Sequence, residues 1–218
     1  MADETTAVAE ESPDRHAAIR ELIVVIVLSV TAVLTAWSGF ESSKWGGEMS
    51  IAFSKASTQR IEASRQAASA DAARAVDLEV FGIYLGAIAA DEPDLERFAE
   101  ERFSEHFDLA FQEWLEMRPL ENPSAPDSPF ALDSYIPPGS VEAAAADSRA
   151  DAFFADALVF NQRGDNYTLV TVLFALVLFF AAFASRVRAM RSSWILTGAA
   201  TVLLVVGTGF LLSFPKIL

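Results

Sequence analysis

The side chains best suited to chemistry are gathered around His106. Glu105 precedes it, and Glu101 and Asp108 lie nearby, so imidazole and carboxylate groups occur within one short stretch. A helical metal site of this kind uses Glu-x-x-His spacing, which places both ligands on one face. Phe103 occupies the position where that Glu would stand, and the H-E-x-x-H pattern is absent from the chain. The sequence therefore predicts a histidine on the surface of a helical bundle and no metal site.

Other catalytic and cofactor-binding patterns are also missing from the sequence. The chain has no cysteine, which excludes a nucleophilic or metal-binding thiolate, and its second histidine, His16, lies in a polar tail. No phosphate-binding loop, dinucleotide fingerprint or EF-hand spacing occurs. Gly207-Thr208-Gly209 lies inside an apolar run and is not a phosphate loop. We expect a protein that is not an enzyme, with no catalytic residues and no cofactor.

A stripe of aromatic residues is the richest candidate feature outside the apolar runs. Phe103, Phe107 and Phe111 recur at steps of four, which places them on one face of a helix. Phe98 and Trp114 belong to the same predicted helix. Two interpretations stay open, the core of a helical bundle and the lining of a ligand pocket, of which the core is the simpler.

The helices that position these residues are predicted from three long apolar blocks in the sequence. Of the 218 residues, 52% are hydrophobic and the mean hydropathy is +0.30, although the formal net charge is −14. Residues 19–40, 166–185 and 192–215 can each cross a bilayer as a helix, which takes about 20 apolar residues. We therefore predict an all-α integral membrane protein with three transmembrane helices in contact with the lipid bilayer.

A cleaved signal peptide is the competing interpretation of the first block. The uncharged run 22–40 is longer than a signal-peptide core of about 7–15 residues, and no A-x-A cleavage site follows it. The preceding residues 1–18 are acidic, which is unlike the start of a signal peptide. We expect a retained transmembrane helix that follows a disordered cytoplasmic tail over 1–18.

Basic residues predict the orientation in the membrane. The loop 186–191 carries three arginines and no acid, which is typical of a cytoplasmic loop. Residues 41–165 then lie outside the cytoplasm, and the location is the inner membrane of a bacterium. Lys216, on the outside, is a mild exception. The topology determinants are Arg15, Arg20, Arg186, Arg188 and Arg191.

Aromatic residues near the ends of the apolar blocks indicate where the bilayer interfaces lie. Amphipathic aromatic rings are enriched at the level of the lipid headgroups. The sequence places four such residues at these ends, so we expect them to anchor the spans there. The expected interfacial residues are Trp37, Phe40, Trp45 and Trp194.

The segment 41–165 is strongly acidic. It carries 24 Asp or Glu residues against 10 Lys or Arg residues. Nucleic acid requires a basic surface and is excluded as a partner. We interpret the acidity as solvation and mutual repulsion of acidic helices. The expected partners are the bilayer together with a second membrane protein or further copies of this chain.

The same segment is expected to form an extracytoplasmic antiparallel helical bundle, partly continuous with spans one and two. Six prolines fall in the excursion 119–139, which cannot be a regular helix. Whether this excursion is ordered, and whether Gly46-Gly47 and Gly164 interrupt the helices, stay open. The predicted helices cover about 48–90, 93–117 and 141–162.

The order of these elements resembles a family of uncharacterised three-span bacterial membrane proteins. The resemblance rests on residues 166–180, on RVRAMRSSW at 186–194 and on residues 207–214. Such proteins carry a Glu/Lys-rich segment like a coiled coil in the middle, where this chain has an aromatic helix and a proline-rich excursion. The resemblance implies the three-span architecture, and it implies no activity and no site residues.

Our first functional hypothesis is a non-enzymatic inner-membrane protein whose extracytoplasmic domain mediates protein interaction or self-assembly. The alternatives are a sensory or ligand-binding module that acts through a partner, and a subunit of an oligomeric channel. No ionisable residue lies inside a span between its flanks, which argues against a self-contained proton-coupled transporter. The pairs Ala32/Ala36 and Gly209/Ser213 permit close helix packing, either between chains or within one chain.

Overall fold

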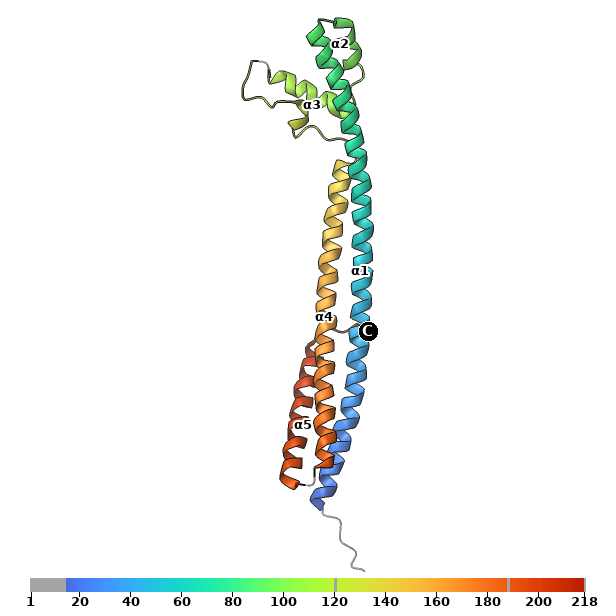
Figure 1. The fold of residues 1–218 in the computed structure, drawn as a ribbon, viewed down its shortest axis with the longest axis vertical. Coiled ribbons are helices and arrows are strands. Elements are labelled where there is room, and N and C mark those ends of the chain that lie inside the picture. The colour runs from blue at the N-terminus through green and yellow to red at the C-terminus, as the bar shows by residue number, and fades with distance from the viewer. Residues whose placement is uncertain (1–14, 120, 188, 218) are drawn as a thin grey trace, which may run out of the picture. The chain divides into compact units, whose positions relative to one another are not determined.

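The computed structural model describes residues 15–119, 121–187 and 189–217, without the side chains of residues 16 and 17. Every regular element in these ranges is helical, and three helices are long and apolar enough to cross a membrane (Figure 1). The predicted all-α chain with three such helices is confirmed. The elements are α1 (Arg15–Ala90), α2 (Pro93–Glu100), α3 (Glu105–Glu116), the 3₁₀ helix η1 (Pro129–Ala131), α4 (Ser140–Arg186) and α5 (Met190–Ser213).

The described chain divides into two compact units. The membrane unit comprises residues 15–51 and 156–217, and the acidic unit comprises residues 52–155. The three predicted spans, 19–40, 166–185 and 192–215, all lie in the membrane unit. The acidic unit carries 20 Asp or Glu and 8 Lys or Arg residues, a net charge of −12. Helices α1 and α4 contribute residues to both units.

In the membrane unit, α4 lies beside both α1 and α5 (Figure 1). Apolar side chains from the three helices form one buried cluster. Gly207 on α5 lies against side chains of α4. A Cβ atom at this position would lie 2.7 Å from the Cε1 atom of Phe174 and 3.1 Å from the Cδ2 atom of Leu173. The buried core comprises Val24, Val27, Trp45, Tyr167, Val170, Phe174, Val177, Ala181, Ala200 and Leu211.

Hydroxyl groups in the membrane unit donate to backbone carbonyls. Thr31 donates to the Val27 carbonyl of its own helix at 2.6 Å. Ser38 instead reaches across to α4, where its Oγ lies 2.8 Å from the Tyr167 carbonyl oxygen. Because an apolar environment offers no water, each hydroxyl needs such an acceptor. These bonds therefore let Ser and Thr occupy the apolar segments without an unpaired donor.

Neither glycine site interrupts its helix. Helix α1 continues through Gly46-Gly47, and α4 continues through Gly164. An interior glycine costs about 1 kcal/mol relative to alanine. Gly164 lies close to α1, because a Cβ atom on it would be 3.6 Å from the Ser42 carbonyl oxygen. At the same level, Ser42 Oγ donates a hydrogen bond to the Gly164 carbonyl oxygen at 3.1 Å. Packing between the helices at this level offsets the low helix propensity of glycine.

Helices α1 and α4 of the acidic unit meet through small side chains and ion pairs. The buried alanines on these helices include Ala56 and Ala63 on α1 and Ala146 and Ala150 on α4. Arg60 forms ion pairs with Asp147 and Asp151 on α4. The two aspartates raise the pKa of Arg60 above its ordinary value. Alanine buries little area but permits a close approach of the two backbones.

The structure differs from the predicted single helix over 93–117. Helix α2 ends at Glu100 and α3 begins at Glu105, with Ser104 as its N-cap. The Ser104 hydroxyl accepts the backbone N–H of Phe107 at 3.3 Å, which replaces a bond that a continuous helix would make. No glycine or proline marks this break, so the residue types predict an uninterrupted helix.

The proline-rich segment 119–139 joins the acidic unit through η1 and two aromatic residues, Phe130 and Tyr135. It ends at Gly139, whose φ of +95° lies in the left-handed region. A Cβ atom on Gly139 would lie 2.6 Å from the Gln66 carbonyl oxygen, so only glycine fits there.

The predicted topology determinants lie at helix ends as far as the structure describes them. Arg186 is the last residue of α4, and Arg191 lies in the first turn of α5. Arg188 and most of the predicted tail, residues 1–14, lie outside the described residues. Helix α1 already begins at Arg15, so residues 15–18 are helical where the sequence predicts a disordered tail. The orientation across the membrane stays a prediction.

Candidate functional site

An aromatic cluster holds the acidic unit together. Phe81 on α1 lies between α3 and the proline-rich segment, with its ring centroid 5.6 Å from that of Phe107 and 5.7 Å from that of Phe130. Tyr84, one turn further along α1, lies 5.1 Å from Phe111 at 84°. Edge-to-face pairs of this kind each contribute about 0.5–1.5 kcal/mol beyond the burial of area. The cluster therefore fixes α3 against α1.

The predicted aromatic stripe divides between this core and the surface. Phe107 and Phe111 are fully buried. Phe103 is half-buried, and its ring lies 4.8 Å from that of Phe107. Trp114 is also half-buried, at the edge of the cluster. Phe98 is 49% exposed on α2, so it belongs to the surface.

Phe98 instead makes a cation–π contact with Arg102. The guanidinium carbon of Arg102 lies 3.4 Å from the centroid of the Phe98 ring. Arg102 also donates to the Phe98 carbonyl oxygen at 2.9 Å. A cation over an exposed ring contributes about 0.5–1 kcal/mol. The break between α2 and α3 thus places Phe98 away from Phe103, although the sequence groups them on one helix.

A buried carboxylate on α1, Asp77, ties both α3 and the proline-rich segment to that helix. Its side chain is 3% exposed. Ser104 Oγ donates to Oδ1 at 2.7 Å, while His106 Nε2 and Tyr135 Oη donate to Oδ2 at 2.7 and 2.9 Å. Burial raises the pKa of the Tyr135 phenol well above its ordinary value, and the hydrogen bond to Asp77 and the charge of Asp77 raise it further. The phenol therefore keeps its proton and acts as a donor.

Ser104, His106 and Asp77 have the composition of a catalytic triad but not its geometry. In a triad the serine and the aspartate contact opposite nitrogens of the imidazole. Here His106 Nε2 faces both Asp77 Oδ2 at 2.7 Å and Ser104 Oγ at 3.2 Å. The Ser104 hydroxyl also donates a hydrogen bond directly to Asp77 rather than to the imidazole. The arrangement positions helices, and no group of three metal-ligating side chains occurs among the described residues.

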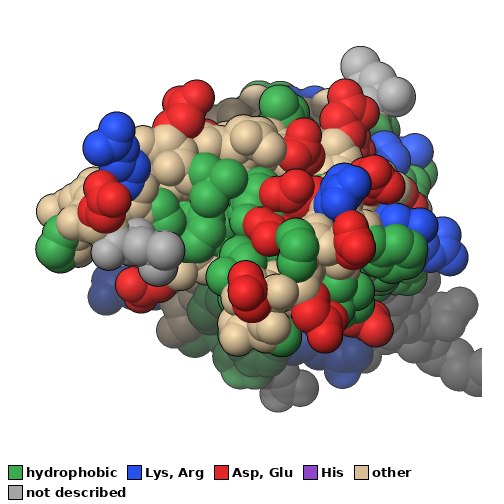
Figure 2. All heavy atoms as spheres, turned by 90° about the horizontal axis from the view of Figure 1, so that it is seen from above, with side chains coloured by type: hydrophobic (Ala, Val, Ile, Leu, Met, Phe, Trp, Pro, Cys, Tyr) green, Lys and Arg blue, Asp and Glu red, His purple; other side chains and the backbone are tan. Residues whose placement is uncertain are grey.

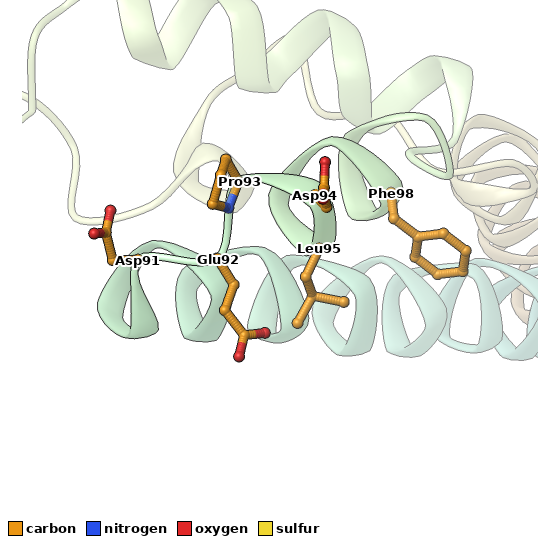
Figure 3. A pocket seen from close by; sticks show the side chains of 6 residues that line it. All are labelled: Asp91, Glu92, Pro93, Asp94, Leu95 and Phe98. Carbon is orange, nitrogen blue, oxygen red and sulfur yellow. The ribbon is translucent and has the colours of Figure 1, made fainter.

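The first surface hollow lies at the turn between α1 and α2, with a volume of about 620 Å³. Figure 3 shows Glu92 and Leu95 directed to the same side of this turn, with Asp94 directed away from them. Leu95 is 37% exposed. The lining residues are Asp91, Glu92, Pro93, Asp94, Leu95 and Phe98.

The second hollow, of about 360 Å³, lies between α1 and α3. Its rim carries Leu85, Ile88 and Leu115, whose side chains are 46%, 49% and 39% exposed. Burial raises the pKa of the Tyr84 phenol in its wall, and the charges of Glu100 and Glu96 add to this. The lining residues are Tyr84, Leu85, Ile88, Trp114, Leu115, Arg118, Pro119 and Glu121.

The surroundings of both hollows are acidic. Residues 91–121 carry 11 Asp or Glu and 3 Lys or Arg residues, a net charge of −8. Figure 2 shows Asp and Glu side chains lying among and around exposed hydrophobic side chains on this face. Exposed apolar groups inside a charged surround are typical of a protein-binding surface. The sequence shows the charge but not the hollows, because these depend on where α2 and α3 separate.

The predicted interfacial aromatics differ in their exposure. Trp37, Phe40 and Trp194 are 38%, 53% and 38% exposed. Trp45 is instead 5% exposed, with its ring 5.6 Å from that of Phe160. It packs between α1 and α4, so its environment is the core of the membrane unit.

Comparison of the chain with protein-family models, curated proteins and solved structures found no match. The resemblance to three-span bacterial proteins therefore stays a prediction.

Proposed function

We propose that this chain is a non-enzymatic bacterial inner-membrane protein whose acidic unit, outside the cytoplasm, binds a partner protein. The observation that carries the proposal is the hollow between α1 and α3. Its rim exposes Leu85, Ile88 and Leu115, and its walls include the aromatic rings of Tyr84 and Trp114. Aromatic and apolar anchors in a pocket are typical of the energetic centre of a protein interface.

The charge of the acidic unit restricts the partner. Its net charge of −12 opposes pairing with nucleic acid, with anionic lipid and with another copy of the same face. A different protein with a neutral or basic docking surface fits best. Three membrane-crossing helices would keep the acidic unit at the membrane, where such a partner would be recruited.

A small-molecule sensor is the second candidate. A volume of about 360 Å³ lies within the range of about 300–1,000 Å³ typical of ligand pockets. Arg118 lines this hollow and would attract an anionic group on the ligand. Its φ of +51° is uncommon for a residue with a side chain, and such strain is concentrated at functional sites. A ligand that raises Tm without changing the mass of the particle would favour this candidate.

The test of the first candidate is the mass of the full-length protein extracted from its membrane in mild detergent. Light scattering should show a single chain together with a stoichiometric companion of a different sequence. Leu85→Ser combined with Leu115→Ser should remove the companion. Leu109→Ser, which changes a 65% exposed leucine on α3 outside the hollow, should retain it. A lone chain in every sample, or a complex insensitive to the double change, contradicts the proposal, and a ring of identical chains favours the channel.

A further inference from the structure

The membrane unit holds a buried carboxyl group, Glu41. It lies on α1 directly after the first predicted span, 19–40, and its side chain is 0% exposed. Oε2 accepts the backbone N–H of Ile217 at 3.1 Å. Oε1 is buried and has no hydrogen-bond partner among the described residues. The Nε1 of Trp45, one turn further along α1, is likewise buried without an acceptor there.

The described charged and titratable groups near Glu41 are either exposed or engaged in other contacts. Lys216 Nζ donates to two backbone carbonyls at the end of α5, at 3.1 and 3.2 Å. The Arg163 guanidinium on α4 lies over an indole ring, 4.6 Å from its centroid. Tyr167 on α4 donates its phenolic proton to a backbone carbonyl at 2.9 Å, and Lys44 on α1 is exposed. No ion pair joins Glu41 to a described Lys, Arg or His.

An ionised carboxylate that is removed from water without a cationic partner is strongly disfavoured, so the group takes up a proton or a cation. Ionisable side chains buried in membrane proteins commonly mark ion or proton sites. We propose that Glu41 is a binding site for a monovalent cation, either H⁺ or Na⁺. The cation neutralises the carboxyl group at Oε1, while Oε2 keeps the hydrogen bond from Ile217.

The site also links the cation to the segment after α5. Phe214 and Ile217 pack against the core of the membrane unit, and the Pro215 carbonyl accepts the Tyr167 phenol. Ile217 holds this segment at Glu41 by donating its backbone N–H to the carboxyl group. Glu41 directly follows the predicted span 19–40 in the sequence, and its burial arises from residues that are distant in the sequence.

The experiment uses the full-length protein in lipid nanodiscs and dicyclohexylcarbodiimide, a reagent that partitions into the bilayer. A protonated carboxyl group adds across one C=N bond of the reagent, and the acyl group then migrates to nitrogen, so no atom is lost. Peptide mass spectrometry detects the adduct. Glu41 should react several-fold faster than the exposed Asp165 on α4, and a water-soluble carbodiimide should reverse this order.

Two buffers distinguish the cations. At one pH, replacing choline with sodium should abolish the labelling of Glu41 if the ligand is Na⁺, and should leave it unchanged if the ligand is H⁺. Glu41→Gln is neutral, retains an acceptor for Ile217 and cannot react, so its Tm should respond less to the cation than the Tm of the wild type. The proposal is overturned if Glu41 stays unlabelled in sodium-free buffer. It is equally overturned if wild type and Glu41→Gln show the same change of Tm with pH and sodium.

Discussion

Asp77 is the residue at which three segments of the acidic unit converge. Its carboxylate accepts hydrogen bonds from Ser104 at the start of α3, from His106 on α3 and from Tyr135 in the proline-rich segment. A buried carboxylate is tolerated when several donors satisfy it. The same carboxylate therefore determines where α3 begins and where residues after η1 attach.

Tyr135→Phe tests this network through its pH dependence. The pKa of Tyr135 is raised in the folded protein, so its contribution to stability is complete below the unfolded pKa of about 10 and is lost as the pH rises toward the higher folded pKa. The free energy of unfolding of the wild type should fall as the pH rises above about 10. The free energy of unfolding of the Tyr135→Phe variant should fall less steeply over the same range. Near neutral pH the variant should be less stable by about 1–3 kcal/mol.

Thermal unfolding of the full-length protein in detergent, followed by circular dichroism at several pH values, measures both effects. Tyr84 and Tyr167 remain in the variant, so part of the alkaline loss should persist. An identical alkaline profile in the two proteins would mean that the Tyr135 phenol does not titrate in a buried network.

The network itself could not be predicted from sequence, and the reason is geometric. His106 is recognisable as a histidine among acids, but its partner is Asp77 on another helix rather than Glu101, Glu105 or Asp108. Helical spacing identifies neighbours within one helix, whereas contacts between helices depend on the turn at Asp91-Glu92 and the break at Ser104. The burial of Glu41 likewise depends on a contact distant in sequence, the one with Ile217.

At the scale of elements, the three helices that are long and apolar enough to cross a membrane were the most predictable part of the chain. Long uncharged runs have a single stable solution in a bilayer, so residue types alone indicate them. The boundary between α2 and α3 was not predictable, because a serine cap and the packing of aromatic rings produce it without glycine or proline. Of the stripe 103/107/111, Phe107 and Phe111 lie on α3 and are buried, whereas Phe103 lies just before that helix begins.

Gly207→Ala tests how α5 packs on α4. The added Cβ would meet the Phe174 ring at 2.7 Å, so the two helices must separate or the ring must move. We expect a loss of about 1–3 kcal/mol, typical of overpacking. Gly209→Ala is the matched control, since nothing lies within 4 Å of a Cβ there. It should be neutral or stabilising by up to about 1 kcal/mol.

Unfolding in mixed micelles of increasing SDS content measures the free energy of unfolding of both variants. Equal stability of Gly207→Ala and Gly209→Ala would show that α5 does not contact α4 at Gly207. The pair Gly209/Ser213, which the sequence singles out for close packing, would then become the better candidate for that contact.

At the scale of the whole molecule, orientation decides which compartment the acidic unit serves. The chain has no cysteine, so single cysteines can report sidedness without background. Ser148 is exposed on α4 in the acidic unit, and Met190 is the first residue of α5. The two variants for this test are Ser148→Cys and Met190→Cys. The arginines of the 186–191 loop predict that this loop is cytoplasmic.

A membrane-impermeant maleimide added to intact spheroplasts should label Ser148→Cys at once. Met190→Cys should react only after the membrane is opened. The reverse pattern would place the acidic unit in the cytoplasm and invert the proposed location.

The most direct test of the proposed function is photo-crosslinking in the native membrane. A benzophenone amino acid at Leu115, on the rim of the hollow between α1 and α3, should yield one discrete adduct with a different protein. The same group at Leu109, exposed on the same helix outside the hollow, should yield none. Adducts of equal yield from both positions, or no adduct from Leu115, would contradict a partner-binding role for this surface.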